Sequence, residues 1–307
     1  MLCNTNTPPF LGRRVFLTRT LITSKSLMRE LANINGKICA LADAVIPAED
    51  RGCLFGDGVY EVLRAYQGRL WGFHRHWKRF HTSLKAIDLL PANLEEIRGW
   101  IEETFRVSQT PNATVYFHLT RGASPRSHSW SEPLKPLFFM SVRPFISRET
   151  MEGVKVQSFP DLRWRRCDIK SLNLLPNVLA KQQARKLGAY EALLVNDQGN
   201  VTEGSSSAAI AILDRTIVTP PQGSSILPSI TREYVEEIAV AMKLEYQQRW
   251  LSLDEFCSAS EVFLAGTSDE ITGITHVDGQ AIGTGEVGPR TQDILRTYQQ
   301  RIQLQMD

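Results

Sequence analysis

The spacing of apolar residues changes from that of a strand to that of a helix between residues 59 and 89, and this change constrains the fold most. Residues 59–66 are rich in strand formers, whereas later apolar residues recur at helical intervals (Trp77, Phe80, Leu84 and Ile87). A second helix is predicted behind Asn93, because Glu96 completes a capping box. Further strands are predicted at 37–45, after the Asn35-Gly36 hairpin signal, and at 69–73, 115–119 and 137–142. The first half is therefore expected to be α+β, with helices packed against one sheet.

The second half mixes the same kinds of element. Pro176 suits the first turn of a helix and Gly188 suits its end, so a helix is predicted over 175–187. We expect a hairpin over 192–203, a helix over 231–244, and strands at 207–213, 262–265 and 271–276. A chain of 307 residues is long enough for two domains. We assign 1–31 to an N-terminal extension, 32–148 to an α+β domain and 149–307 to a second domain.

Composition and charge exclude several classes of function. The net charge of +2 indicates no electrostatic commitment to nucleic acid or to an anionic membrane. No apolar run approaches the roughly 20 residues that span a bilayer. The five cysteines are odd in number and lack C-x-x-C spacing, which favours reduced thiols in the cytoplasm without a metal site. The extension is basic before its first acidic residue, Glu30, so organellar targeting and an untidy upstream extension both stay open.

Lys170 is the strongest candidate for a catalytic group. It is expected at the end of an apolar strand, where an amine is unfavourable unless it has a chemical role. A desolvated, neutral amine is suited to Schiff-base chemistry. Glu203, on a later strand, is a carboxylate of the kind that a pyridinium nitrogen requires. The alternative is an ordinary salt bridge between the two residues.

Four other blocks suggest a site for an anionic ligand. Three glycines in the segment 52–58 allow close approach of the backbone to a ligand. His76 and Arg79 lie three residues apart on one helix face, and arginine can fork onto a phosphate. The helix that begins near Ile230 offers free N–H groups to an anion. Gly266-Thr267-Ser268 supplies a second hydroxyl-rich turn. Each block alone is equally explained as ordinary capping or turn formation.

In this order, the blocks resemble those of the fold-type IV pyridoxal-phosphate enzymes. This group includes D-amino-acid aminotransferases, branched-chain aminotransferases and aminodeoxychorismate lyases, and the resemblance runs from about residue 34 to the C-terminus. It implies an α/β protein of the α+β type, with a smaller N-terminal domain and a larger β-barrel-like C-terminal domain flanked by helices. It also implies pyridoxal 5'-phosphate as the cofactor and a homodimer as the assembly.

The resemblance assigns roles residue by residue. Lys170 corresponds to the lysine that bonds covalently to the cofactor, and Glu203 to the carboxylate beside the pyridine nitrogen. Arg79 corresponds to the phosphate-binding arginine, with His76 and Glu61 as its supporting network. The further phosphate donors are Ile230, Thr231 and Thr267, and the residue packed on the ring is Leu227.

One block distinguishes members within the group. Arg126 and His128 match an Arg-x-His pair that D-amino-acid aminotransferases place across the dimer interface to bind the substrate carboxylate, together with a tyrosine that matches Tyr60. The expected reaction is transamination of a D-alanine-like amino acid with 2-oxoglutarate, giving a 2-oxo acid and D-glutamate. The lyase and the branched-chain L-amino-acid aminotransferase remain alternatives. The chain departs from the usual pattern at Ala208, Ser229 and Gly273, where Asn, Gly and Pro are common.

Overall fold

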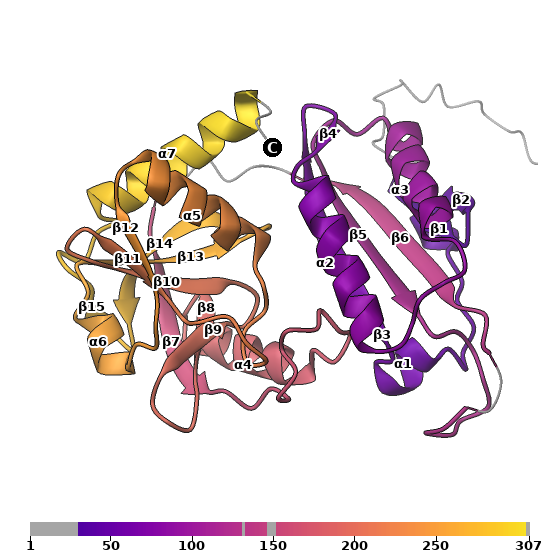
Figure 1. Ribbon diagram of the computed structural model, residues 1–307, viewed down its shortest axis with the longest axis horizontal. Helices are drawn as coiled ribbons and strands as arrows, with labels where there is room; N and C mark the ends of the chain where they lie inside the picture. Colours follow the sequence, from indigo (N-terminus) through magenta and orange to yellow (C-terminus); the bar gives the residue numbers. More distant parts are fainter. Residues whose placement is uncertain (1–29, 131–132, 146–151, 305–307) are drawn as a thin grey trace, which may run out of the picture.

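A computed structural model describes residues 30–130, 133–145 and 152–304, and its strands form two separate sheets (Figure 1). The first sheet is antiparallel throughout, in the order β2-β1-β6-β5-β3-β4. Its strands are β1 (Leu31–Ile34), β2 (Lys37–Ala40), β3 (Gly58–Tyr66), β4 (Arg69–Leu70), β5 (Ala113–Thr120) and β6 (Leu137–Pro144).

Two long helices cover one face of this first sheet (Figure 1). Phe80 and Leu84 of one helix, and Ile97 and Ile101 of the other, are buried against the strands, which confirms the predicted apolar faces. Asn93 caps the second helix by accepting a hydrogen bond from the Glu96 N–H at 3.1 Å. The helical segments of this half are the 3₁₀ turn Leu41–Asp43, α1 (Arg51–Phe55), α2 (Phe73–Ala86) and α3 (Leu94–Ser108).

The second sheet closes on itself, because β9 pairs with both β8 and β10. The closed path runs β10-β13-β14-β7-β8-β9, with β11 and β12 extending it beyond β10. Its strands are β7 (Val154–Pro160), β8 (Glu191–Val195), β9 (Val201–Gly204), β10 (Ala208–Leu213), β11 (Thr216–Thr219), β12 (Glu245–Gln248), β13 (Glu261–Gly266), β14 (Glu270–Val277) and β15 (Gln280–Ala281). The helices of this half are α4 (Leu175–Lys186), α5 (Ile230–Ala241), α6 (Leu253–Cys257) and α7 (Pro289–Leu304).

Several predicted boundaries are wrong for local reasons. The strand expected to reach residue 45 stops at Ala40, because its partner β1 begins at Leu31, opposite that residue. The strand expected over 69–73 stops at Leu70, since Gly72 takes a left-handed φ of 65° and α2 starts directly after it. The helix expected to reach residue 244 ends at Ala241. Helices α1, α6 and α7 were not predicted.

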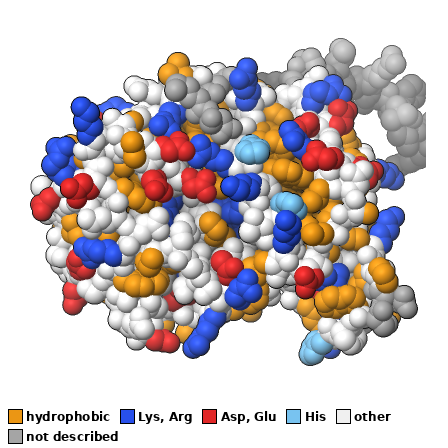
Figure 2. All heavy atoms as spheres, in the orientation of Figure 1, with side chains coloured by type: hydrophobic (Ala, Val, Ile, Leu, Met, Phe, Trp, Pro, Cys, Tyr) orange, Lys and Arg blue, Asp and Glu red, His pale blue; other side chains and the backbone are white. Residues whose placement is uncertain are grey.

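The predicted domain limits stay predictions. The division at residue 148 falls within 146–151, outside the described residues, as does nearly all of the extension 1–31. Among the described residues, no helix is both long and apolar enough to cross a membrane. Figure 2 shows side chains of both charge signs interspersed over the face in view.

Candidate active site

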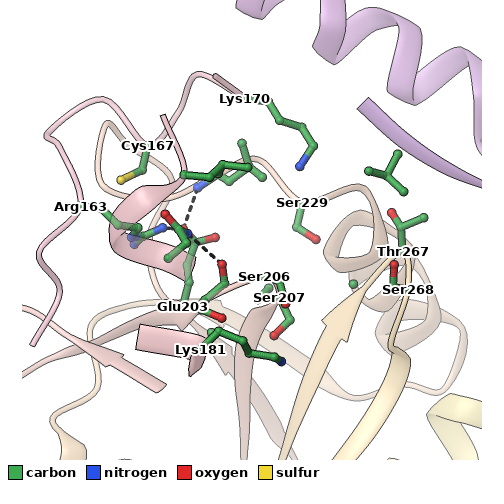
Figure 3. A pocket seen from close by; sticks show the side chains of 18 of the residues that line it. Arg163, Cys167, Lys170, Lys181, Glu203, Ser206, Ser207, Ser229, Thr267 and Ser268 are labelled. Carbon is green, nitrogen blue, oxygen red and sulfur yellow. Dashed lines mark hydrogen bonds and ion pairs between the residues drawn. The ribbon is translucent and has the colours of Figure 1, made fainter. Parts of the chain in front are cut away.

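A cavity of about 510 Å³ lies between the two halves of the molecule and is lined from both (Figure 3). The first half contributes Tyr60 and Val62 from β3 and Arg79 from α2. The second contributes segments that are distant in sequence: 163–174, α4, the end of β9 with the serines that follow it, 227–230, and the turn after β13. The ends of β9 and β13 meet at the cavity because both strands pair with the start of β10.

Lys170 lies in this cavity, but in an irregular segment between β7 and α4 and not at the end of a strand as predicted. Its backbone is nevertheless fixed: the Tyr60 N–H donates to its carbonyl at 3.0 Å, and its own N–H donates to the Ser83 hydroxyl at 3.1 Å. The side chain is only partly buried, and its Nζ lies 4.3 Å from the centre of the Tyr60 ring. Within the described residues, Nζ has no hydrogen bond or ion pair, so the amine is available to a ligand.

Glu203, on β9, is 4% exposed and points into the same cavity (Figure 3). Its Oε2 accepts hydrogen bonds from Arg163 Nη1 at 2.5 Å and from the Leu227 N–H at 3.2 Å. Oε1 has no partner among the described residues. Burial raises the pKa of Glu203 above its ordinary value even though Arg163 acts in the opposite direction. A cationic donor facing Oε1 would therefore stabilise the carboxylate.

Arg79 is held by a buried network that the sequence predicted. Its guanidinium makes two hydrogen bonds of 2.8 Å to Glu61 and one of 2.8 Å to the carbonyl of Pro228. His76 Nδ1 lies 2.7 Å from the same carboxylate. Burial alone would raise the pKa of Glu61, but Arg79 and His76 hold it well below its ordinary value. Two of the five guanidinium N–H donors of Arg79 remain for a ligand.

The cavity also contains several groups suited to an anion. Helix α5 begins at the cavity wall, where Ser229 caps it by accepting a hydrogen bond from the Arg232 N–H. The first N–H groups of a helix have no acceptor within the helix, so they can bind an anion. The Ser207 hydroxyl is buried yet has no hydrogen-bond partner among the described residues. Thr267 and Ser268 line the wall beside it (Figure 3).

The structure brings most of the predicted site residues together. Lys170, Glu203, Arg79, Tyr60, Leu227, Ile230 and Thr267 all line the cavity. Thr231 is buried but is not among the lining residues. Arg126 and His128 are exposed and lie outside the cavity. Among the described residues, no group of His, Cys, Asp or Glu side chains is arranged to hold a metal ion.

The loop that carries Arg126 and His128 is anchored by a buried arginine that sequence reasoning missed. Arg51 donates to the carbonyls of Ser127 at 2.7 Å and His128 at 3.1 Å. Its guanidinium also lies over the rings of Phe55 and Trp130, and it pairs with Asp57. Arg121 binds the same carboxylate, at 2.9 Å, and so helps to hold the loop.

Arg163 and Glu191 are two further polar residues that sequence reasoning missed. Arg163 donates two hydrogen bonds to Asp161 and also forms an ion pair with Glu203. Glu191 is fully buried at the start of an apolar strand and accepts from the hydroxyls of Ser205 and Ser206 and from Lys181 Nζ. A carboxylate within an apolar run is unfavourable without partners, and this was the available signal for Glu191.

Two of the unusual residues have local explanations. Ser229 supplies the N-cap hydroxyl that α5 requires. Gly273 packs against Val287, where an added Cβ would lie 2.6 Å from a methyl carbon, so the site admits no side chain. Ala208 lies buried in the cavity wall next to Ser207, whose hydroxyl has no hydrogen-bond partner among the described residues.

Comparisons with known proteins agree with this geometry. The family model for amino-transferase class IV matches residues 58–277. A D-alanine aminotransferase of Bacillus licheniformis is 37% identical over 271 residues, covering 87% of this chain and 95% of that protein. A second, from Staphylococcus epidermidis, is 39% identical over 277 residues, covering 88% and 97%.

Solved structures share the fold. A branched-chain aminotransferase from Thermoproteus uzoniensis, solved with norvaline, superposes with a TM-score of 0.81 at 26% identity, covering 89% of this chain and 94% of that one. A hypothetical aminotransferase from Mycobacterium tuberculosis in a PLP-bound form superposes with a TM-score of 0.78 at 21% identity, covering 89% and 98%.

The fold and the cavity define a fold-type IV enzyme, as the resemblance in sequence implied. The chain belongs to the class IV aminotransferase family.

Proposed function

We propose that this protein is a pyridoxal-phosphate-dependent D-amino-acid aminotransferase. It transfers the amino group of a D-alanine-like substrate to 2-oxoglutarate, giving a 2-oxo acid and D-glutamate. The observation that carries the proposal is the unpartnered Lys170 amine in one cavity with Glu203 and Arg79. The 37–39% identity to D-alanine aminotransferases supports the D-configuration of the substrate.

The residues of the cavity fit pyridoxal phosphate at both ends of the ring. The unoccupied Oε1 of Glu203 suits a protonated ring nitrogen, because the added positive charge offsets the burial of the carboxylate. Arg79, the N-terminus of α5 and Thr267 suit the phosphate, with the orphaned Ser207 hydroxyl as a further donor. Leu227 lines the cavity, where it would contact the ring.

The cofactor, when bound, draws electrons away from the substrate Cα into its ring. Lys170 Nζ would carry the proton, removing it from the substrate Cα as a general base and then giving it up as a general acid. Tyr60 keeps the amine near the reaction by packing against Nζ at 4.3 Å. Arg163 orients Glu203 and favours its anionic form, since it binds that carboxylate at 2.5 Å while Asp161 fixes the position of Arg163.

The substrate carboxylate is bound across a homodimer in this proposal. Arg126 and His128 are exposed and outside the cavity of their own chain, which supports their action in the cavity of a second copy, beside Tyr60. The outer face of α4, near the cavity, exposes three apolar side chains suited to a protein interface (Leu175, Val178 and Leu179). The cysteines of the described residues are free thiols, which supports a reducing compartment such as the cytoplasm.

Spectra of the purified protein test the assignment. We expect yellow protein whose cofactor band is converted by D-alanine but not by L-alanine or L-leucine. Conversion by L-leucine alone would favour the second candidate, a branched-chain L-amino-acid aminotransferase. The likeness to the Thermoproteus enzyme is the observation that supports this candidate. Protein that remains colourless with excess pyridoxal phosphate would overturn both.

A further inference from the structure

The short hairpin at residues 66–72, which joins β3 to α2, crosses from the first half of the molecule into the second. We propose that this crossing hairpin is the positioning element of the phosphate end of the cofactor site, an inference that rests on the proposed function. It does so by fixing three separate phosphate-binding elements relative to one another: α2, α5 and the turn after β13.

The first contact is made by Tyr66, the last residue of β3. Its hydroxyl donates to Glu270 Oε1 at 2.7 Å. Glu270 opens β14 and follows Thr267 by three residues, within the turn that borders the cavity. The bond therefore ties the end of β3 to the Thr267 turn.

The second contact is made by Trp71, which is 8% exposed and inserted into the apolar core of the second half. Its ring stacks on Tyr234 of α5, with ring centres 5.0 Å apart. Its Nε1–H donates to the hydroxyl of Tyr298 on α7 at 3.0 Å, and both partners are buried. A buried indole N–H left without a partner would be destabilising, so this bond selects one position of the hairpin on α5 and α7.

Gly72 makes the third contact and leads directly into α2. Its φ of 65° would strain any other residue, and a Cβ there would make a tight contact of 3.2 Å with the Tyr234 hydroxyl. Arg79 follows two helical turns later on α2, the helix that Gly72 begins. Arg75, between them, pairs with Glu237 of α5 at 2.8 Å.

Phosphate binding depends on this alignment because its donors come from both halves. Arg79 belongs to α2, the free N–H groups to α5, and the Thr267 hydroxyl to the turn after β13. Charge-assisted hydrogen bonds weaken steeply as their geometry is lost, so a small displacement of one half affects the phosphate most. The ring-nitrogen end is less dependent on it, because Glu203 and its partners Arg163 and Leu227 all belong to the second half.

The test compares two ligands that differ only in the phosphate: pyridoxal 5'-phosphate and pyridoxal. Dissociation constants are measured by equilibrium dialysis for the wild-type chain and for the double variant Tyr66→Phe/Tyr298→Phe, which deletes the two hydroxyls through which the crossing hairpin bonds to the second half. The double variant should bind pyridoxal phosphate about threefold to tenfold more weakly, as expected for one or two lost hydrogen bonds. Its affinity for pyridoxal should change by less than about twofold, within the range of neutral changes.

A matched control removes a buried hydroxyl bond that lies within the first half. Thr104→Val deletes the 2.8 Å bond from Asn33 and should leave both affinities unchanged. An equal loss of affinity for both ligands in the double variant, or no loss for either, would overturn the proposed role of the hairpin. A wild-type chain that binds neither ligand would instead refute the proposed function. Thermal unfolding of each variant confirms that the proteins compared are folded.

Discussion

Glu61 and Glu203 are two buried carboxylates whose surroundings shift their pKa values in opposite directions. Burial raises both pKa values, but Arg79 and His76 overcome it at Glu61, whereas Arg163 alone does not overcome it at Glu203. Glu61 is therefore a permanent anion that fixes Arg79. The negative charge of Glu203, in contrast, would be stabilised by a cationic group of a ligand. The motif located both residues, but Arg163 lies in no recognisable pattern, so the pairing could not be predicted from sequence.

Replacement of Glu61 should change the free energy of unfolding by an amount that depends on pH. Because the folded pKa is lowered, the stabilisation is present above the ordinary value of 4.5 and is lost as the pH falls below it. Glu61→Gln should lower the free energy of unfolding at pH 7 by about 3 kcal/mol, since it leaves Arg79 buried without its anion. The difference from wild type in urea titrations should shrink toward about pH 3. Glu95→Gln, at an exposed site on α3, is the control, and a gap independent of pH would refute the assignment.

Replacement of Lys170 should separate chemistry from folding. Lys170→Ala should abolish turnover and the absorbance band of the lysine-bound cofactor, while its partly exposed position predicts little change in stability. Steady-state transamination and thermal unfolding are the measurements. Lys186→Ala, which removes an exposed lysine at the end of α4, should retain activity. Appreciable turnover by Lys170→Ala would exclude this lysine as the proton carrier.

Among the elements, the loop 121–130 is ordered by Arg51 from outside it and by Arg121 at its own start. Arg51 binds two of its carbonyls, and Arg121 contacts the Trp130 ring at 4.0 Å while it pairs with Asp57. The sequence predicted the loop and its Arg-x-His pair, but segment 51–55 was interpreted only as part of a glycine-rich turn. It is a one-turn helix that is capped by Asp50 and that faces the loop. Such short helices are stabilised by tertiary contacts, which local pattern does not encode.

Weakening of this anchor should affect the substrate and not the cofactor. Lysine cannot reproduce the two donated bonds and the ring contacts of Arg51. Arg51→Lys should therefore raise the KM for D-alanine about threefold to tenfold, with the affinity for pyridoxal phosphate unchanged. Initial rates and cofactor titrations measure the two effects. Arg98→Lys, at an exposed ion pair on α3, is the control, and a parallel loss of cofactor affinity would contradict a role confined to the loop.

At the scale of the whole molecule, the site is assembled from two sheets of different construction. The alternating strand and helix patterns predicted α+β organisation, and the antiparallel first sheet confirms it. The closure of the second sheet through the β9–β10 pair depends on contacts between distant segments, so periodicity could not predict it. Helix α7 was missed although it buries Ile294 and Tyr298 against α5 and β14. Its long polar stretches lower the contrast on which helix prediction depends.

Mixed dimers test whether two chains share each site. Lys170→Ala and Arg126→Ala homodimers should each be inactive or severely impaired. A random mixture of the two chains places both defects in one site of each heterodimer and none in the other, so about a quarter of the wild-type activity should return. Activity after co-refolding is the measurement, with each variant refolded alone as the control. Activity no greater than the sum of the two parents would show that Arg126 acts within its own chain.

The exposed position of Arg126 and His128 also has a consequence for how the enzyme behaves at low abundance. In the proposed homodimer, dissociation would leave each chain with the groups that hold the cofactor but would remove those proposed to recognise the carboxylate of the amino-acid substrate. We therefore expect dilution to reduce substrate selectivity and saturation by substrate first. Loss of the cofactor, and with it of the yellow colour, should follow only at lower concentration.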